Sequence, residues 1–227
     1  MAPQSTSAVL LDSLGTLVSM DSPAPHLREE LLRRTGVDVG EEAAQRAFVA
    51  EISYYLEHQL EGSDPAALDD LRDRCAVAMS DALGMEGLDQ ATARDAMLGA
   101  LHFSAFPDAP DTLRELRERG LRLVVASNWD CSLPGVLEEA GLAPLLDGVV
   151  TSASVGATKP DAAVFEAALE LAGCTASEAV HVGDSLENDV AGARSMGIEA
   201  VLLDRGTGSA HDGVTTIATL AELPRIL

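Results

Sequence analysis

Positive charge is scarce in this sequence. Of its 227 residues, 15 are lysine or arginine and 37 are aspartate or glutamate, so the formal net charge is −22 at pH 7. A surface this acidic repels phosphodiester backbones and anionic lipid headgroups, and the basic residues form no patch that would overcome the repulsion. We therefore expect no nucleic-acid partner and no membrane-surface partner.

Long apolar runs and paired cysteines are absent too. No stretch reaches the roughly 18 consecutive apolar residues that cross a bilayer, and residues 1–7 are polar without the basic residues that begin a secretory leader. The 3 cysteines form no C-x-x-C pair, which favours reduced thiols over a disulfide framework or a cysteine zinc site. These absences predict a cytoplasmic protein and leave its oligomeric state open.

Short continuous apolar runs are present, mostly in the second half of the chain. Such runs are typical of strands buried on both faces, and they stand at residues 8–11, 121–126, 148–151, 179–182 and 199–203. Helical patterns that end in glycine lie between the later runs. Strands that alternate with helices in this way predict right-handed β-α-β units and hence an α/β fold with a parallel sheet.

Between the first two runs, the chain carries only helical periodicity. Apolar residues recur at helical spacing there, in the stretches 48–60, 68–82 and 93–101. Glycine-containing turns separate these stretches, and proline-rich segments border the region at both ends. We predict a helical cap of residues 20–105, inserted into an α/β core of residues 1–19 and 106–227.

Four polar clusters stand after predicted strands. They are Asp12-Ser-Leu-Gly-Thr-Leu17, Ser127-Asn128, Thr158-Lys-Pro-Asp161 and Gly183-Asp-Ser-Leu-Glu-Asn-Asp189. Each cluster alone has a structural explanation, such as a helix cap or a turn. Since open α/β folds bind ligands at the carboxyl ends of their strands, the four clusters together indicate a functional site.

Phosphoryl transfer is the chemistry that these residue types share. Asp12 and Asp184 would hold Mg²⁺, which prefers oxygen ligands. With the phosphate neutralised, the Asp12 carboxylate would attack phosphorus and form an aspartyl-phosphate. The Ser127 hydroxyl and the Asn128 amide would donate hydrogen bonds to phosphate oxygens. Asp189 would orient the metal and its waters without binding the ion directly.

Lys159 is the only lysine in the chain, and the other 14 basic residues are arginines. Arginine presents a planar fork of donors, whereas lysine presents a compact point charge. A single lysine placed after the third predicted strand favours a point charge on the transferred phosphoryl group.

The order of the four clusters, with a helical region after the first, resembles the haloacid dehalogenase-like (HAD) hydrolase superfamily, in the branch with a helical cap between its first and second motifs. The most specific segment is Val182-Gly-Asp-Ser-Leu-Glu-Asn-Asp-Val-Ala-Gly-Ala-Arg-Ser-Met-Gly197. The resemblance implies a Rossmann-like core and Mg²⁺-dependent hydrolysis of a small phosphorylated metabolite through an aspartyl intermediate. By motif position, it makes Asp12 the nucleophile, Ser127 the phosphate-binding hydroxyl, Lys159 the motif lysine, and Asp184 and Asp189 the metal carboxylates.

One position departs from the family's pattern. Phosphatases of the family carry a second aspartate two residues after the nucleophile, as general acid and base, and Leu14 stands there. Leucine transfers no proton, and loss of a positioned acid or base typically costs about 10²–10⁴ in rate. The metal site tolerates the change, because in the family this residue contributes its backbone carbonyl to Mg²⁺, and Leu14 retains one.

Leu14 leaves three interpretations open. The protein is a phosphatase whose substrate has a good leaving group or whose acid comes from elsewhere, with Asp130 and His26 as candidates. Alternatively, it is similar to 2-haloacid dehalogenases, which release halide without a proton donor, although Asp184 and Asp189 count against that. The third interpretation is a HAD-fold binding or regulatory protein with little turnover.

The remaining histidines show no ligand spacing. His58, His102, His181 and His211 are far apart in the sequence, and His181 lies within a predicted buried strand. We interpret all of them as structural.

Overall fold

The computed structural model describes residues 6–206 and 211–227. The chain divides into two compact units. Residues 1–19 and 104–227 form one, which we call the core unit, and residues 20–103 form the other, the helical unit. Residues 1–5, part of the stretch on which the leader interpretation rests, lie outside the described residues.

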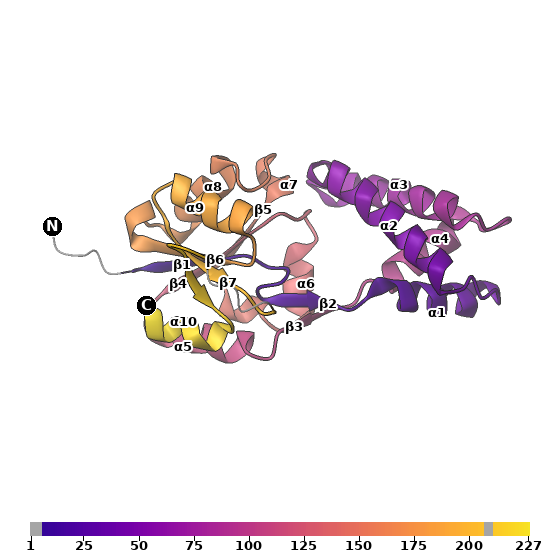
Figure 1. The fold of residues 1–227 in the computed structure, drawn as a ribbon. Helices are drawn as coiled ribbons and strands as arrows, with labels where there is room; N and C mark the ends of the chain where they lie inside the picture. Colours follow the sequence, from indigo (N-terminus) through magenta and orange to yellow (C-terminus); the bar gives the residue numbers. More distant parts are fainter. Residues whose placement is uncertain (1–5, 207–210) are drawn as a thin grey trace. The chain divides into compact units, whose positions relative to one another are not determined.

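A six-stranded sheet forms the centre of the core unit (Figure 1). Its neighbouring strands are all parallel, in the order β5-β4-β1-β6-β7-β8. The strands are β1 (Ala8–Leu11), β4 (Arg122–Ser127), β5 (Gly148–Thr151), β6 (Ala179–Gly183), β7 (Glu199–Leu203) and β8 (Thr215–Ile217). The predicted α/β class with a Rossmann-like parallel sheet is confirmed. The edge strand β8 has no counterpart in the prediction, because only its last residue is buried.

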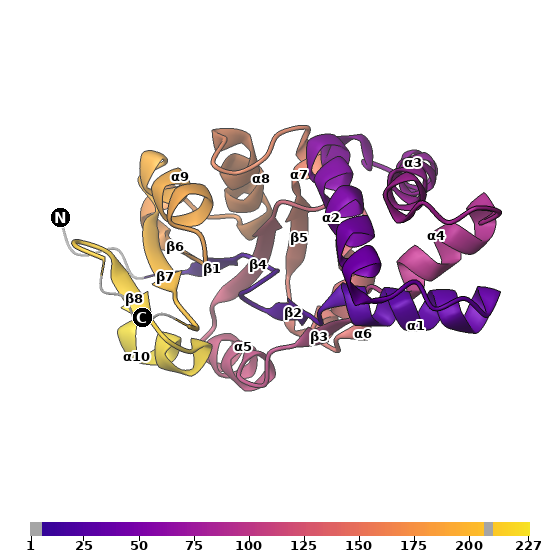
Figure 2. The ribbon, with the colours of Figure 1, turned by 45° about the vertical axis from the view of Figure 1, so that its right-hand side comes forward.

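Helices cover both faces of this sheet (Figure 2). On one face lie α8 (Ala162–Ala172) and α9 (Gly192–Ser195), where Phe165 belongs to the same buried apolar cluster as Leu10 and Val124. On the other, α5 (Ala109–Glu118) packs against β4 and α10 (Leu223–Ile226). Full burial of one large apolar side chain contributes about 1.5–3 kcal/mol, so strands that are apolar on both faces hold the layers together. The other helices described in the core unit are α6 (Leu133–Glu139), α7 (Ser152–Val155), η2 (Ala143–Leu145), η3 (Ala176–Glu178), η4 (Leu186–Ala191) and η5 (Leu220–Glu222).

The helical unit, all of which is described, contains α1 (Pro23–Thr35), α2 (Glu41–His58), η1 (Gln59–Glu61), α3 (Pro65–Leu83) and α4 (Gln90–Gly99). Asp64 and Asp89 cap the first turns of α3 and α4, because each carboxylate accepts backbone N–H groups there. The segments that lead into and out of the unit, β2 (Val18–Met20) and β3 (Phe103–Ala105), pair as a two-stranded sheet. Nowhere in the described parts of the chain is a helix both long and apolar enough to cross a membrane.

The buried face of α2 differs from the predicted apolar stripe. Ala44, Ala47 and Glu51 are buried, whereas Phe48 is half-buried and Leu56 is exposed. α2 packs against α3, and small alanines at such a contact let two helices approach closely. Phe48 and Leu56, which the sequence pattern assigned to the buried stripe, are thus less buried than these alanines.

Replacing Glu51 by glutamine is expected to make stability less dependent on pH. Burial raises the pKa of the Glu51 carboxyl to about 7, from an ordinary value of 4.5. Between these two pH values the folded chain keeps the proton and the unfolded chain loses it, so stability falls as pH rises through this window. Above pH 7 the ionised, buried carboxylate costs up to about 3 kcal/mol, which Glu51→Gln would recover.

Urea unfolding at pH 5.5 and pH 8 measures this effect. The variant should gain stability over the parent protein at pH 8 and much less at pH 5.5. Glu57→Gln, a change to an exposed residue of the same helix, is the matched control and should not alter the pH slope. Equal pH slopes for Glu51→Gln and the parent would contradict the prediction.

Candidate active site

Three neighbouring parallel strands end at one edge of the core sheet, where β1 lies between β4 and β6. Asp12 directly follows β1, Ser127 is the last residue of β4, and Asp184 directly follows β6. From β1 the chain builds the sheet first to one side and then to the other. Such a switch point is where open α/β sheets bind ligands, so these residues stand where a site is expected.

Lys159 lies between two buried carboxylates. Its Nζ is 2.7 Å from Asp12 Oδ1 and 2.6 Å from Asp189 Oδ1, and only 2% of its side chain is exposed. Burial alone lowers the pKa of Lys159, but the charges of Asp12 and Asp189 outweigh burial and raise the pKa above its usual value. The lysine is therefore a fixed positive charge between two negative ones.

The Asp12 carboxylate is oriented by two donors. Ser127 Oγ donates to Asp12 Oδ1 over 3.0 Å, and the Lys159 ammonium donates to the same oxygen. Among the described residues, no hydrogen bond is found to Asp12 Oδ2. Asp12 thus presents a fixed carboxylate with one oxygen available to an ion or a reacting group.

Asn128 holds the backbone of the lysine segment. Its Oδ1 accepts from the Lys159 backbone N–H at 2.7 Å, and its Nδ2 donates to the Lys159 carbonyl oxygen at 3.1 Å. From the sequence, this amide is expected to donate to phosphate oxygens. In the structure, one of its two N–H donors positions Lys159, which leaves the second for a ligand.

Three groups form hydrogen bonds to the Asp189 carboxylate. One oxygen lies 2.6 Å from Lys159 Nζ and 2.9 Å from His181 Nε2, and the other accepts from the Ser185 backbone N–H at 3.0 Å. Burial alone raises the pKa of Asp189, but the His181 hydrogen bond and the Lys159 charge hold it well below its usual value. A Cβ at Gly183 would lie 2.2 Å from the Asp189 carboxyl carbon, so this contact requires glycine. Asp189 therefore braces the lysine directly, a contact that its predicted role did not include.

His181 is a site residue that sequence reasoning missed. It is fully buried in β6 and forms its hydrogen bond to Asp189 through Nε2, while Nδ1 finds no partner in the described parts of the chain. The pairing places the ring proton on Nε2. A polar residue inside an otherwise apolar strand was the available signal, and the sequence analysis interpreted it as structural.

The acidic residues of this edge fit a divalent cation. One carboxylate oxygen each from Asp12, Asp184 and Asp189 lies within 4.8 Å of the others. Burial, then the charges of Asp12 and Asp189, raise the pKa of Asp184 to about 6. Gly15, with a φ of +82°, lies directly against this carboxylate, because a Cβ there would be 2.1 Å from Asp184 Oδ2. Such concentrated negative charge is what a hard, oxygen-seeking ion such as Mg²⁺ would offset.

A cavity of about 140 Å³ opens between these side chains, and Leu14 lines it together with Asp12, Ser127, Asn128, Lys159, Asp184, Ser185, Asn188 and Asp189. Leu14 is 40% exposed. An apolar group without a proton to transfer thus borders the space beside the candidate nucleophile.

The turn after Asp12 is braced by an arginine that sequence reasoning also missed. The Arg205 guanidinium donates to the carbonyl oxygens of Gly15 and Thr16 and to the Asp108 carboxylate, and it stacks over the Phe106 ring at 3.8 Å. It lines a neighbouring cavity of about 470 Å³. Because its N–H groups bind the Gly15 and Thr16 carbonyl oxygens, Arg205 positions the turn that follows Asp12.

The two candidates for a substitute acid have different surroundings. Asp130 is 4% exposed, and its Oδ1 accepts from the Ser132 backbone N–H at 2.7 Å, which supports the turn before α6. His26 belongs to the helical unit, where its Nε2 lies 3.9 Å from Asp21 Oδ2.

Comparison with known proteins identifies one hydrolase family. A family model described as haloacid dehalogenase-like hydrolase matches residues 6–197. Ribulose-1,5-bisphosphate 5-phosphatase of Halopiger xanaduensis is 40% identical over 115 residues, which cover 47% of this chain and 48% of that protein. The match thus spans about half the length of this curated relative.

Two solved structures share the fold over nearly the whole chain. A HAD phosphatase from Thermococcus onnurineus superposes with a TM-score of 0.67 at 26% identity, covering 97% of both chains. A 2-haloacid dehalogenase from Pseudomonas syringae superposes with a TM-score of 0.70 at 24% identity, also covering 97% of both. The second likeness shows the fold alone, so the chemistry has to be argued from the site.

Proposed function

The chain belongs to the haloacid dehalogenase-like hydrolase family, and from that premise we propose that it is a Mg²⁺-dependent phosphatase of a small phosphorylated metabolite. The observation that carries the proposal is the buried Asp12 carboxylate, held by Ser127 and Lys159 next to Asp184. A carboxylate fixed beside a positive charge and a hydroxyl donor suits attack on a phosphate ester. The phosphatase names among the similar proteins agree with this assignment.

In the proposed reaction Asp12 is the nucleophile. One of its oxygens bonds to phosphorus while the ester oxygen leaves with the bonding electron pair, and an aspartyl-phosphate forms. Water then attacks phosphorus as the bond to Asp12 breaks, which releases inorganic phosphate and restores the carboxylate. One proton of the water stays on the phosphate, and the other passes through solvent to the departed alkoxide. Ser127 donates to a phosphoryl oxygen, and Lys159 offsets the charge of the transferred group.

A divalent ion completes this arrangement. Asp12, Asp184 and the Leu14 backbone carbonyl would hold Mg²⁺, with Asp189 oriented toward Lys159 and steadying the group. Bound there, Mg²⁺ supplies positive charge that lets a carboxylate approach an anionic phosphate.

Leu14 limits the substrates that this site handles well. Without a proton donor at that position, the leaving oxygen departs as an anion, so esters of acidic alcohols and phenols are favoured. Leu14→Asp is expected to raise kcat on alkyl phosphates by about 10²-fold or more, and on aryl phosphates by much less. The measurement is steady-state kinetics on one alkyl and one aryl phosphate. Leu14→Asn, with similar shape and no acidic proton, is the control, and an equal gain on both substrates would remove the leaving-group argument.

The absence of a proton donor at Leu14 also favours a second candidate function, because halide leaves a 2-haloacid unprotonated. One set of assays separates the candidates. A phosphatase hydrolyses an aryl phosphate with Mg²⁺ and stops in EDTA. A dehalogenase releases chloride from a 2-haloacid in EDTA. A binding protein does neither, while Mg²⁺ and phosphate together raise its Tm. Release of chloride from the 2-haloacid, with no release of phosphate from the aryl phosphate, would contradict the proposal.

A further inference from the structure

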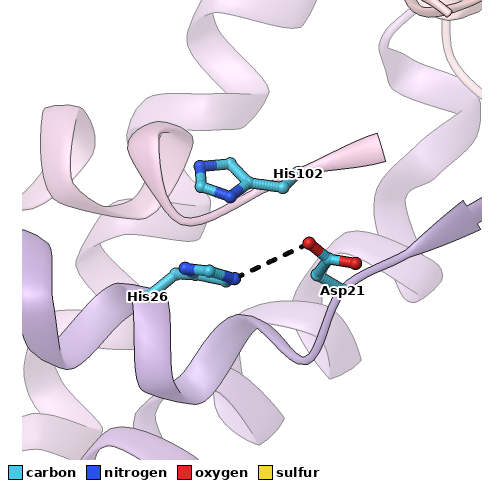
Figure 3. A group of neighbouring side chains, drawn as sticks. All are labelled: Asp21, His26 and His102. Carbon is cyan, nitrogen blue, oxygen red and sulfur yellow. Dashed lines mark ion pairs between the residues drawn. The ribbon is translucent and has the colours of Figure 1, made fainter. Parts of the chain in front are cut away.

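The helical unit brings together three metal-ligand side chains that are remote in the sequence. Asp21 precedes α1, His26 lies in the first turns of α1, and His102 immediately precedes β3. One ligand atom of each lies within 4.8 Å of the others. Figure 3 shows the Asp21 carboxylate and both imidazole rings turned toward a common space.

The backbone holds this cluster in place. The Asp21 backbone N–H donates to the His102 carbonyl oxygen at 3.0 Å, so the segments that enter and leave the helical unit are tied at these residues. The rings of His26 and His102 lie 4.2 Å apart between centroids, at an angle of 47°. His26 Nε2 is 3.9 Å from Asp21 Oδ2, an ion pair without a hydrogen bond.

The three side chains are accessible to solvent, and their ligand atoms are not occupied by hydrogen bonds within the described residues. Asp21 and His102 are exposed and His26 is half-buried. In the part of the chain that the structure describes, no side-chain hydrogen bond engages any of the three. Two imidazoles and a carboxylate therefore face one another with their ligand atoms free for solvent or an ion.

We propose that Asp21, His26 and His102 form a binding site for a transition-metal dication of the zinc class. Imidazole nitrogens and one carboxylate oxygen suit Zn²⁺, Co²⁺ or Ni²⁺, whereas Mg²⁺ prefers oxygen ligands throughout. Around Zn²⁺, bonds of about 2.0–2.2 Å place tetrahedral ligands roughly 3.3 Å apart. Side-chain rotations that shorten these separations by up to about 1.5 Å bring the atoms to that distance, with a fourth position left for water.

Asp21 has a second role in this site. The N-terminus of α1 carries a partial positive charge, which disfavours a cation beside His26. The Asp21 carboxylate offsets that charge as well as supplying a ligand. The bound ion would tie the two ends of the helical unit to the start of α1. The site shares no residue with the candidate active site, so the proposal does not depend on the proposed phosphatase activity.

Zinc binding to the full chain tests the proposal. The protein is stripped with a chelator, kept reduced and titrated with Zn²⁺ against a chromophoric chelator, in millimolar Mg²⁺ that saturates oxygen-ligand sites. We expect one tight equivalent. His26→Ala, His102→Ala and Asp21→Asn should each weaken binding at least about tenfold. His58→Ala is the matched control, because His58 belongs to the same unit and pairs with Glu61 instead, and its affinity should equal that of the parent.

A second readout does not depend on variants that fold. In the parent chain, Zn²⁺ should shift the ring-proton resonances of two of the 5 histidines, and His26→Gln and His102→Gln should identify them. Absence of saturable binding would overturn the proposal. So would full zinc affinity in a folded His26→Ala/His102→Ala double variant, or loss of binding in Asp184→Asn alone, which would place the ion in the core unit.

Discussion

Asp12→Asn should abolish hydrolysis and leave the protein folded. Asparagine matches aspartate in shape and still accepts a hydrogen bond from Ser127, but its amide is not a nucleophile. Lys159 keeps Asp189 as a partner at 2.6 Å, so the buried charge remains paired. We expect kcat on an aryl phosphate to fall at least about 10⁴-fold, the scale of loss when a nucleophile is removed.

The control for this prediction is Asp111→Asn on the exposed surface of α5, which should retain activity. Circular dichroism and Tm verify that both variants fold. Single turnover in ¹⁸O-water adds a readout on the parent enzyme. If water attacks the phosphorus of an aspartyl-phosphate, the label appears in phosphate. If water attacks the Asp12 carboxyl carbon of an ester intermediate, the label appears in Asp12. Measurable turnover by folded Asp12→Asn, within tenfold of the parent, would exclude Asp12 as the nucleophile.

Lys159→Met should damage both catalysis and stability. Methionine has a similar stem but no charge, so the transferred phosphoryl group loses the lysine's positive charge and kcat should fall about 10³–10⁵-fold. The change also leaves Asp12 and Asp189 buried without their shared counter-ion. Breaking a buried ion pair in this way typically costs about 3–5 kcal/mol, which urea unfolding would measure at pH 7.

Two further variants separate the catalytic loss from the folding loss. Lys159→Met combined with Asp12→Asn removes one of the stranded charges, so part of the stability should return while activity stays absent. Lys159→Arg keeps the charge but needs room for a planar fork, and only 2% of the lysine side chain is exposed. Turnover in Lys159→Arg should therefore remain low. Parent-like stability in Lys159→Met would show that the buried pair contributes little to folding.

Both predictions depend on how Lys159 is positioned. The Asn128 amide clamps its backbone, and Asp189 holds its ammonium. His181 in turn holds Asp189. The Lys159 charge is thus held by groups that need not touch the substrate, and we predict that changes to His181 reduce kcat more than they raise KM.

Local patterns in the sequence were sufficient for the fold class, and they named candidate site residues whose roles stay predictions. Apolar runs of strand length, separated by helical periodicity, indicate a parallel sheet because each signal is contained within a few neighbouring residues. Asp12, Ser127 and Asp184 then follow from their positions directly after strands, since parallel strands share one carboxyl edge. Lys159 was found because it is the only lysine in the chain.

The sequence by itself therefore determined the α/β class, the helical region, the order of the strand-end clusters and the absence of a carboxylate at Leu14. Only the tertiary structure decided what these residues touch: that Asp189 braces Lys159, that Arg205 holds the turn at Gly15, and that His26 and His102 meet Asp21. The physical reason is the sequence distance over which each kind of interaction acts. Periodicity and capping act between neighbours along the chain, whereas these contacts join residues from different strands, loops and helices and exist only once the layers have packed.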